Sequence, residues 1–211
     1  MKGITPHVAL IGKRNSGKSY LINRLTGHDI AIVSDTPGTT TDPVYKNCEL
    51  LPFGSVKFID TAGYDDKGAT GELRVKKSRK IIDYADFLIL VSRPSLFTVE
   101  DMLFIKENSS RILVVFTFCD IDDEFFNATF QEKKKSLIEI HNVDKSFKKG
   151  FDNNVILNNA QNKIPNFDYD FIKKTGISVF CVSNTLNTGV RDLKDQLVSL
   201  LEELKKGELI W

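Results

Sequence analysis

The stretch Gly12-Lys13-Arg14-Asn15-Ser16-Gly17-Lys18-Ser19 decides the fold, because it matches the phosphate-binding pattern GxxxxGK[ST]. It follows the apolar run 7–11, which indicates a buried strand, and precedes a helical pattern through residues 21–25. Glycines here let backbone N–H groups converge on phosphates, and a helix N-terminus adds its positive dipole end. We therefore expect Lys18 to contact the β- and γ-phosphates of a nucleotide and Ser19 to ligate Mg2+. The alternative is a glycine-rich turn that binds nothing, which this strand-and-helix context disfavours.

Apolar runs alternate with helical patterns along most of the remaining chain. We expect strands at 44–51, 56–59, 87–91, 112–116 and 179–182, and helices at about 72–83, 99–106 and 190–205. Such alternation indicates a mostly parallel sheet covered by helices on both faces. Pro52-Phe53-Gly54 separates two of the strands as a hairpin turn, which would add one antiparallel edge. The predicted fold class is α/β, with a six-stranded sheet in a three-layer sandwich.

One long segment interrupts this alternation between Asp120 and Ser183. Residues 133–140 fit the crossover helix, and the Asn- and Lys-rich residues at about 142–170 are predicted to be an inserted surface loop. The three lysines 133–135 are interpreted as a solvated helix face rather than a binding patch. The sequence has no internal repeat, so we expect one domain over residues 1–211.

The composition excludes several classes of protein. With 29 Lys and Arg against 28 Asp and Glu, the formal charge is +1, which argues against coating nucleic acid or an anionic membrane. The three cysteines form no CxxC pair, so we interpret them as buried apolar residues and expect no iron–sulfur cluster in this segment. No apolar run suits a signal peptide or a transmembrane helix. We therefore expect no membrane partner and a cytoplasmic location, or an organellar matrix in a eukaryote.

Two further polar segments occur where a nucleotide switch needs them. Asp60-Thr61-Ala62-Gly63 follows a predicted strand as a DxxG element, in which Asp60 would hold Mg2+ through water and the Gly63 amide would sense the γ-phosphate. Before it lies Pro37-Gly38-Thr39-Thr40-Thr41-Asp42, placed where switches carry a Mg2+-binding Thr. The alternatives are an ordinary turn and an ordinary Ser/Thr loop, and the phosphate-binding pattern nearby disfavours both.

Together GxxNxGKS, PGTT and DTAG resemble the translation-factor-related GTPases of the tRNA-modification and ribosome-assembly branch. More narrowly, the chain resembles the GTPase domain of the HydF family, maturation factors and scaffolds for the active-site cluster of FeFe hydrogenases. This resemblance rests on residues 14–19, on Asp29-Ile30-Ala31-Ile32-Val33-Ser34-Asp35, on Pro37-Gly38-Thr39-Thr40-Thr41-Asp42-Pro43-Val44-Tyr45-Lys46, on Glu49-Leu50-Leu51-Pro52 and on Gly71-Glu72-Leu73-Arg74-Val75. It is close over residues 6–92, moderate to Asp120, absent in the insertion and present again from Val179. It implies a Ras-like P-loop GTPase fold and a switch domain that binds GTP and GDP.

The resemblance also implies how hydrolysis proceeds. Asn15 matches the Asn that coordinates a monovalent cation in potassium-activated relatives, and the backbone carbonyls of Ser34 to Thr36 would join it at the K+. Such an ion neutralises charge that develops between the β- and γ-phosphates. Thr40 is implied as the switch ligand of Mg2+, with Thr39 and Thr41 as alternatives. Tyr64 stands where Ras-like proteins have a water-positioning Gln, so hydrolysis should be slow.

The base-recognition motif departs from the family pattern. Where these GTPases have NKxD, this chain has Thr117-Phe118-Cys119-Asp120. The Asp120 carboxylate can accept hydrogen bonds from guanine N1–H and N2–H2, which adenine cannot supply, so guanine preference should survive. Each bond lost with the Asn costs about 1 kcal/mol net, and Phe118 could stack on the base in place of the Lys stem. The implied nucleotide contacts are Asn15, Ser16, Gly17, Lys18, Ser19, Tyr20, Asp60, Gly63, Thr117, Phe118, Asp120, Ser183 and Asn184, and the implied catalytic residues are Asn15, Lys18, Thr40 and Gly63.

Three functions stay open at this point. The first is a GTP-hydrolysing switch of the HydF kind. The second is a nucleotide-binding scaffold module with little turnover, which the altered NKxD favours. The third is a GTPase of tRNA modification or ribosome assembly with RNA as partner, which the near-neutral charge disfavours.

In HydF-like proteins a dimerisation domain and a cluster-binding domain follow the GTPase domain. We expect this sequence to be a fragment from which both are absent, because it ends as a new strand pattern begins. The implied partners of the full-length protein are a second copy of itself, other hydrogenase maturases and the hydrogenase. No nucleic-acid partner is expected.

Overall fold

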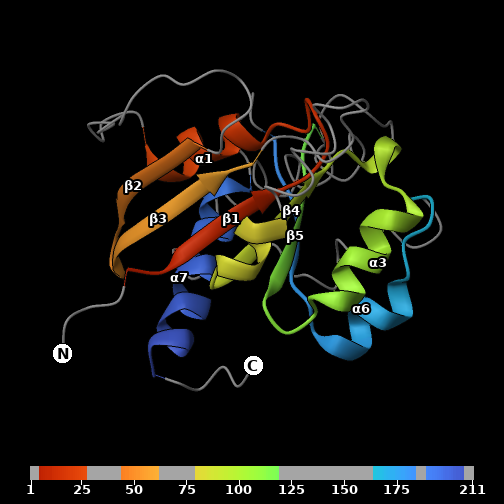
Figure 1. Ribbon diagram of the computed structural model, residues 1–211. Coiled ribbons are helices and arrows are strands. Elements are labelled where there is room, and N and C mark those ends of the chain that lie inside the picture. Colours follow the sequence, from red (N-terminus) through yellow and green to blue (C-terminus); the bar gives the residue numbers. More distant parts are fainter. Residues whose placement is uncertain (1–4, 28–43, 62–78, 119–163, 184–188, 207–211) are drawn as a thin grey trace, which may run out of the picture.

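The computed structural model describes residues 5–27, 44–61, 79–118, 164–183 and 189–206, and the strands in these ranges form one six-stranded sheet (Figure 1). The strands are β1 His7–Ile11, β2 Val44–Leu50, β3 Gly54–Asp60, β4 Phe87–Ser92, β5 Ile112–Phe116 and β6 Val179–Cys181. Their order across the sheet is β2-β3-β1-β4-β5-β6. Only β2 and β3 pair antiparallel, while each other neighbouring pair is parallel. The predicted α/β class, six-stranded sheet and single antiparallel edge are confirmed.

Helices cover both faces of this sheet (Figure 1). On one face α1 (Lys18–Thr26) and α7 (Val190–Lys206) bury their apolar side chains against the strands. On the other face lie the helical residues 79–84, α3 (Val99–Glu107) and α6 (Tyr169–Thr175). A short 3-10 turn, η1 (Pro94–Leu96), precedes α3. The result is the predicted three-layer arrangement.

The strands bury both of their faces, which explains their continuous apolar runs. Successive side chains of a strand point to opposite sides, so Val8 and Leu10 pack toward α1 and α7, whereas Ala9 and Ile11 pack toward α3. All six residues of β4 and all five of β5 are buried. An edge strand with one solvated face shows alternation instead, and β2 does so over its last four residues, Asn47 to Leu50, after a first half that has no buried residue.

The end of the predicted surface loop differs from the structure. Residues 142–163 lie outside the described ranges. In residues 164–170, Ile164, Phe167 and Tyr169 pack against the core, and the other residues are half-buried or exposed. Ile164 is 5% exposed, and the Phe167 ring centroid lies 5.5 Å from that of Phe97 and 5.7 Å from that of Phe116. These apolar side chains bury themselves under α3, so this end of the segment belongs to the folded core.

The sequence analysis did not predict helix α6. Its seven residues are too few to establish a periodic apolar pattern. Two capping signals were present: Asp168 accepts a hydrogen bond from the Phe171 N–H at 3.1 Å, and Gly176 ends the helix at φ 70°. The predicted helix at 133–140 and the first part of the one at 72–83 lie outside the described residues.

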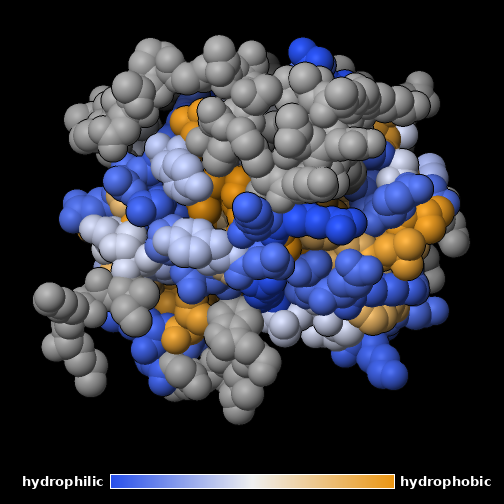
Figure 2. Space-filling model, in the orientation of Figure 1, coloured by the Kyte–Doolittle hydropathy of each residue, from blue (hydrophilic) through white to orange (hydrophobic). Residues whose placement is uncertain are grey.

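The surface of the described part is mixed in character. Figure 2 shows hydrophilic residues over much of the visible face and hydrophobic residues in separate patches. Within the ranges given above, no helix is long and apolar enough to cross a lipid bilayer.

Candidate nucleotide-binding site

The phosphate-loop residues 12–17 connect the carboxyl end of β1 to the start of α1. Because β1, β3, β4 and β5 run parallel, their carboxyl ends meet at one edge of the sheet. In an open parallel sheet this edge is where ligands bind. The loop lies at this edge beside the residues that follow the other strands (Figure 1).

Glycine is required at the first position of the loop. A Cβ on Gly12 would lie 2.1 Å from the carbonyl oxygen of Val91, the fifth residue of β4. The loop backbone therefore crosses the end of β4 at a distance that excludes any side chain. At the other end, Gly17 has φ 92° and begins α1, and Asn15 between them has φ 59°. These left-handed residues curl the loop around the start of the helix.

The side chain of Lys18 lies within this curl. Its Nζ donates to the carbonyl oxygens of Gly12 at 2.9 Å and of Lys13 at 2.6 Å, and the residue is 7% exposed. The loop thus holds a buried ammonium group beside the backbone N–H groups at the start of α1. Phosphate oxygens suit this arrangement, since they are strong acceptors for both kinds of donor.

Ser19 and Asp60, each predicted to be a ligand of Mg2+, lie in contact. The Ser19 hydroxyl donates to Asp60 Oδ2, and Asp60 Oδ1 is buried with no hydrogen-bond partner among the described residues. Thr61 holds this segment in place, because its hydroxyl donates to the Leu10 carbonyl oxygen at 2.7 Å. A hydroxyl and a carboxylate with a spare buried oxygen fit Mg2+, which prefers oxygen ligands.

Thr117 connects the base-motif segment to the phosphate loop. Its side chain is buried, and its hydroxyl lies 2.6 Å from the Ser16 carbonyl oxygen and 3.2 Å from that of Ser92. The sequence analysis counted the replacement of Asn by Thr as a loss of hydrogen bonds. The structure shows that a hydroxyl at this position still joins the end of β5 to the loop.

Two side chains at this edge were missed by the sequence analysis. The Arg93 guanidinium lies 3.8 Å from the centroid of the Phe118 ring. The Lys13 ammonium donates to the Leu96 carbonyl at 2.7 Å and lies 3.5 Å from Asp101 Oδ2. No local signal marks Arg93 or Lys13, because each partner is distant in the chain.

Asp101 is a buried carboxyl group at the first turn of α3. It is 1% exposed and accepts from the Thr98 N–H at 2.8 Å in a capping box, whose Thr-x-x-Asp pattern was a readable signal. Burial raises the pKa of Asp101, and the opposing effects of the Thr98 N–H and the Lys13 ammonium do not cancel it. The phosphate loop is therefore connected to α3 through an ion pair between the partly exposed Lys13 ammonium and the buried Asp101 carboxylate.

Of the other predicted site residues, the structure describes two, and the rest lie outside the described ranges. Tyr20 is 47% exposed and its hydroxyl accepts from Arg24 at 2.9 Å, so its described contact is along α1. Ser183 is buried beyond the end of β6. The remaining predicted residues lie outside the described ranges and stay predictions: Ser34, Thr36, Thr40, Gly63, Asp120 and Asn184.

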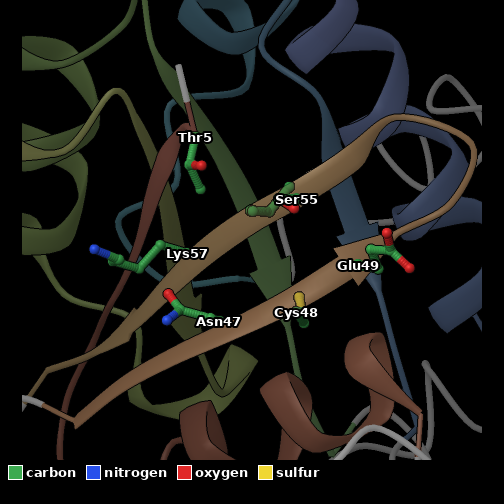
Figure 3. Close-up of a pocket in the computed structure, with 7 residues that line it drawn as sticks. Thr5, Asn47, Cys48, Glu49, Ser55 and Lys57 are labelled. Carbon is green, nitrogen blue, oxygen red and sulfur yellow. The ribbon is translucent and has the colours of Figure 1, made fainter. Parts of the chain in front are cut away.

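A separate pocket lies over the β2–β3 hairpin. Figure 3 shows Asn47, Cys48 and Glu49 on β2 and Ser55 and Lys57 on β3 around it. Lys57 pairs in register with His7 at the start of β1, so the pocket is at the opposite end of the strands from the phosphate loop. Burial raises the pKa of the Cys48 thiol to about 11, as expected for an unreactive buried cysteine. Cys48 and Cys181 are both buried, as predicted, and Cys119 lies outside the described residues.

Comparison with known sequences identifies GTPases. The model of a family described as 50S ribosome-binding GTPase matches residues 7–118. GTPase Der of Borreliella burgdorferi is 36% identical over 126 residues, which are 56% of this chain and 29% of Der. The tRNA modification GTPase MnmE of Prochlorococcus marinus is 32% identical over 205 residues, which are 94% of this chain and 41% of MnmE. The chain therefore spans less than half the length of either relative.

Solved structures share the fold. The structure of Aquifex aeolicus Era bound to GDP and AlF4− has a TM-score of 0.57 and 20% identity, covering 92% of this chain and 56% of that one. The G domain of the T. maritima FeoB iron transporter has a TM-score of 0.52 and 21% identity, covering 93% and 98%. The fold of this chain is thus that of a P-loop GTPase.

Proposed function

The chain belongs to the family described as 50S ribosome-binding GTPase, and we propose that it is a GTP-hydrolysing switch domain. We further propose that this domain serves a HydF-like scaffold for FeFe-hydrogenase cluster assembly. The observation that carries the GTPase part is the contact between Ser19 and Asp60 beside the loop that holds Lys18. The HydF assignment is supported by the amino-acid sequence of residues 29–46, which resembles the first switch region of HydF proteins. A domain of this kind would report the phosphate state of its nucleotide to the rest of the scaffold.

In this proposal the phosphate loop binds GTP through its backbone N–H groups and Lys18. The Lys18 ammonium exchanges the carbonyl oxygens of Gly12 and Lys13 for the β- and γ-phosphate oxygens. Ser19, Asp60 and Thr40 would hold Mg2+, which neutralises charge on the same phosphates when bound. The Gly63 amide and Thr40 would read the γ-phosphate, so both switch segments would change on its release.

Guanine recognition in this proposal rests on fewer groups than usual. Asp120 would accept from the two guanine N–H groups, Ser183-Asn184 would supply a backbone contact, and Phe118 would stack on the base. Tyr64 replaces the water-positioning Gln, so slow hydrolysis would depend on K+ held by Asn15, Ser34 and Thr36. GTP, Mg2+ and K+ are therefore the proposed ligands.

We expect the turnover of GTP to be faster in potassium than in sodium salts at equal ionic strength. Asn15→Ala should remove most of the difference between the two salts while GDP binding persists, because Asn15 is proposed to coordinate the cation. Lys18→Ala should abolish turnover in both salts, since the phosphates lose their buried ammonium. The measurement is single-turnover phosphate release, with Asn23→Ala on α1 as a control, since Asn23 contacts Lys46 at 2.7 Å rather than the loop.

Two results of this assay would contradict the proposal. A wild-type rate equal in the two salts would reject the potassium mechanism. Tight GDP binding without measurable turnover in either salt would instead support a scaffold module with little hydrolysis.

The second candidate is a GTPase of tRNA modification or ribosome assembly, which the names of the matching family and of MnmE favour. The two candidates differ in the binding partners that they imply for a longer protein containing this domain, so a pull-down distinguishes them. We expect hydrogenase maturases or the hydrogenase to be retained in a pull-down, with a difference between GTP and GDP that Thr40→Ala removes. Retention of tRNA or ribosomal particles in place of those proteins would favour the second candidate.

A further inference from the structure

The ends of β4 and β5 place a cation and an aromatic ring in contact. These parallel strands pair in register up to Ser92 and Phe116, and the Thr117 N–H donates to the Ser92 carbonyl at 2.9 Å. The residues that follow, Arg93 and Phe118, therefore leave the sheet side by side. The Arg93 guanidinium lies 3.8 Å from the centroid of the Phe118 ring, well inside the range of a cation–π contact.

The backbone of Phe118 is held in an uncommon conformation. Its φ is 57°, in the left-handed region that aromatic residues rarely adopt. Such a conformation persists only when its surroundings hold it. The hydroxyl of the preceding Thr117 donates to the Ser16 carbonyl at 2.6 Å, and its N–H donates to the Ser92 carbonyl at 2.9 Å. The position of the Phe118 ring is thereby defined relative to the phosphate loop.

Phe118 and Arg93 together supply the two properties that a single Lys side chain has in the family pattern. In the family pattern a Lys at this position supplies both an apolar stem and a positive charge. Here Phe118 supplies a flat apolar surface, and Arg93 supplies the charge from an adjacent strand. A planar guanidinium stacks on a ring face, so Arg93 covers one face of Phe118, and a base would stack on the opposite face.

We propose that Arg93 is a positioning residue of the guanine site, which stacks on Phe118 and so holds the ring against the base of the bound nucleotide. This inference rests on the proposed function, since it takes the base to lie at Phe118. It adds Arg93, which lies outside the altered NKxD motif, to the residues of the site. The contribution should be specific to the base, because the Arg93 guanidinium lies over the aromatic ring that is proposed to stack on that base.

The test uses the full 211-residue chain and two ligands, GDP and inorganic pyrophosphate, each titrated by calorimetry with Mg2+. Arg93→Ala should weaken GDP binding about fivefold, the size expected for one cation–π contact, and leave pyrophosphate binding unchanged. In a Phe118→Leu background the same substitution should have no further effect on GDP. Arg93→Lys should retain part of the affinity for GDP, since the positive charge remains but the planar guanidinium that stacks on the ring is lost.

A matched control is available on the same molecule. The Lys205 ammonium lies 5.6 Å from the Phe53 ring centroid, and Lys205→Ala removes this second cation–π contact away from the site without an expected effect on either ligand. If Arg93→Ala does not fold, as judged by circular dichroism, Arg93→Met preserves the stem and takes its place.

Four outcomes would overturn the inference. Equal losses for GDP and pyrophosphate would show that Arg93 merely supports the loop. Unchanged GDP affinity, or an equal loss in the Phe118→Leu background, would show that the pair has no role in base binding. A wild-type chain that binds pyrophosphate but not GDP would reject the proposed function and this inference with it.

Discussion

Gly12→Ala is expected to abolish guanine-nucleotide binding and to lower the free energy of unfolding. The added Cβ would lie 2.1 Å from the Val91 carbonyl oxygen, and Val91 is fully buried and paired with Val115 in the middle of the sheet. The strand cannot yield, so the loop must move away from it. Backbone strain and overpacking each cost about 1–3 kcal/mol. The moved loop would no longer direct its N–H groups at the phosphates.

Gly27→Ala is the matched control for this experiment. Gly27, at the end of α1, also has a positive φ, at 75°, but a Cβ there would meet no atom within 4 Å. It should incur the backbone strain alone and bind nucleotide normally. Urea denaturation measures the stabilities, and a GDP titration measures binding. Equal behaviour of the two variants would mean that the close approach to β4 does not constrain the loop.

Lys13→Met is expected to lower the free energy of unfolding by about 1–3 kcal/mol at neutral pH, the usual cost of removing one partner of a buried polar group. Its ammonium lies 3.5 Å from Asp101 Oδ2, and the Asp101 side chain has no exposed surface. The substitution would remove this ammonium group, while the Thr98 N–H and hydroxyl still donate to the carboxylate. Because the Lys13 carbonyl also accepts from Lys18, nucleotide affinity should fall together with stability.

The pH dependence of this loss has a definite sign. The folded-state pKa of Asp101 is raised, mainly by burial, and the Lys13 ammonium opposes that rise. Lys13→Met should raise this pKa further, so the folded variant takes up a proton before the unfolded chain does as the pH falls. Its deficit in stability should therefore be largest at neutral pH and become smaller toward acid pH, through the interval between the unfolded and the folded pKa.

Denaturation of wild type and variant at several pH values measures this. The double variant Lys13→Met with Asp101→Asn removes both charges and should recover most of the stability, because an Asn oxygen can still accept from Thr98. A deficit that is independent of pH, or no recovery in the double variant, would contradict the ion-pair explanation.

The strands and the phosphate loop could be predicted because their signals are local. The apolar run before Gly12 and the pattern Gly12–Ser19 specify a strand, a tight loop and a helix start within a few residues. The strand at 112–116 was predicted to the residue, since a run buried on both faces has clear ends. Helix α6 was missed because its seven residues are too few to establish a repeated apolar pattern.

The sequence by itself determined which motif residues to expect at the nucleotide site. The loop glycines, Lys18, Ser19 and Asp60 are recognisable from the spacing of two short motifs that follow predicted strands. The tertiary structure decided which other side chains complete it. The hydroxyl of Thr117 bonds the carbonyl of Ser16 across 101 positions of the chain, and Lys13 pairs with Asp101 on α3. These contacts exist because the parallel order β1-β4-β5 brings the carboxyl ends of distant strands to one edge. A sequence pattern of period two or 3.6 records which residues are buried, but not which strand lies beside which.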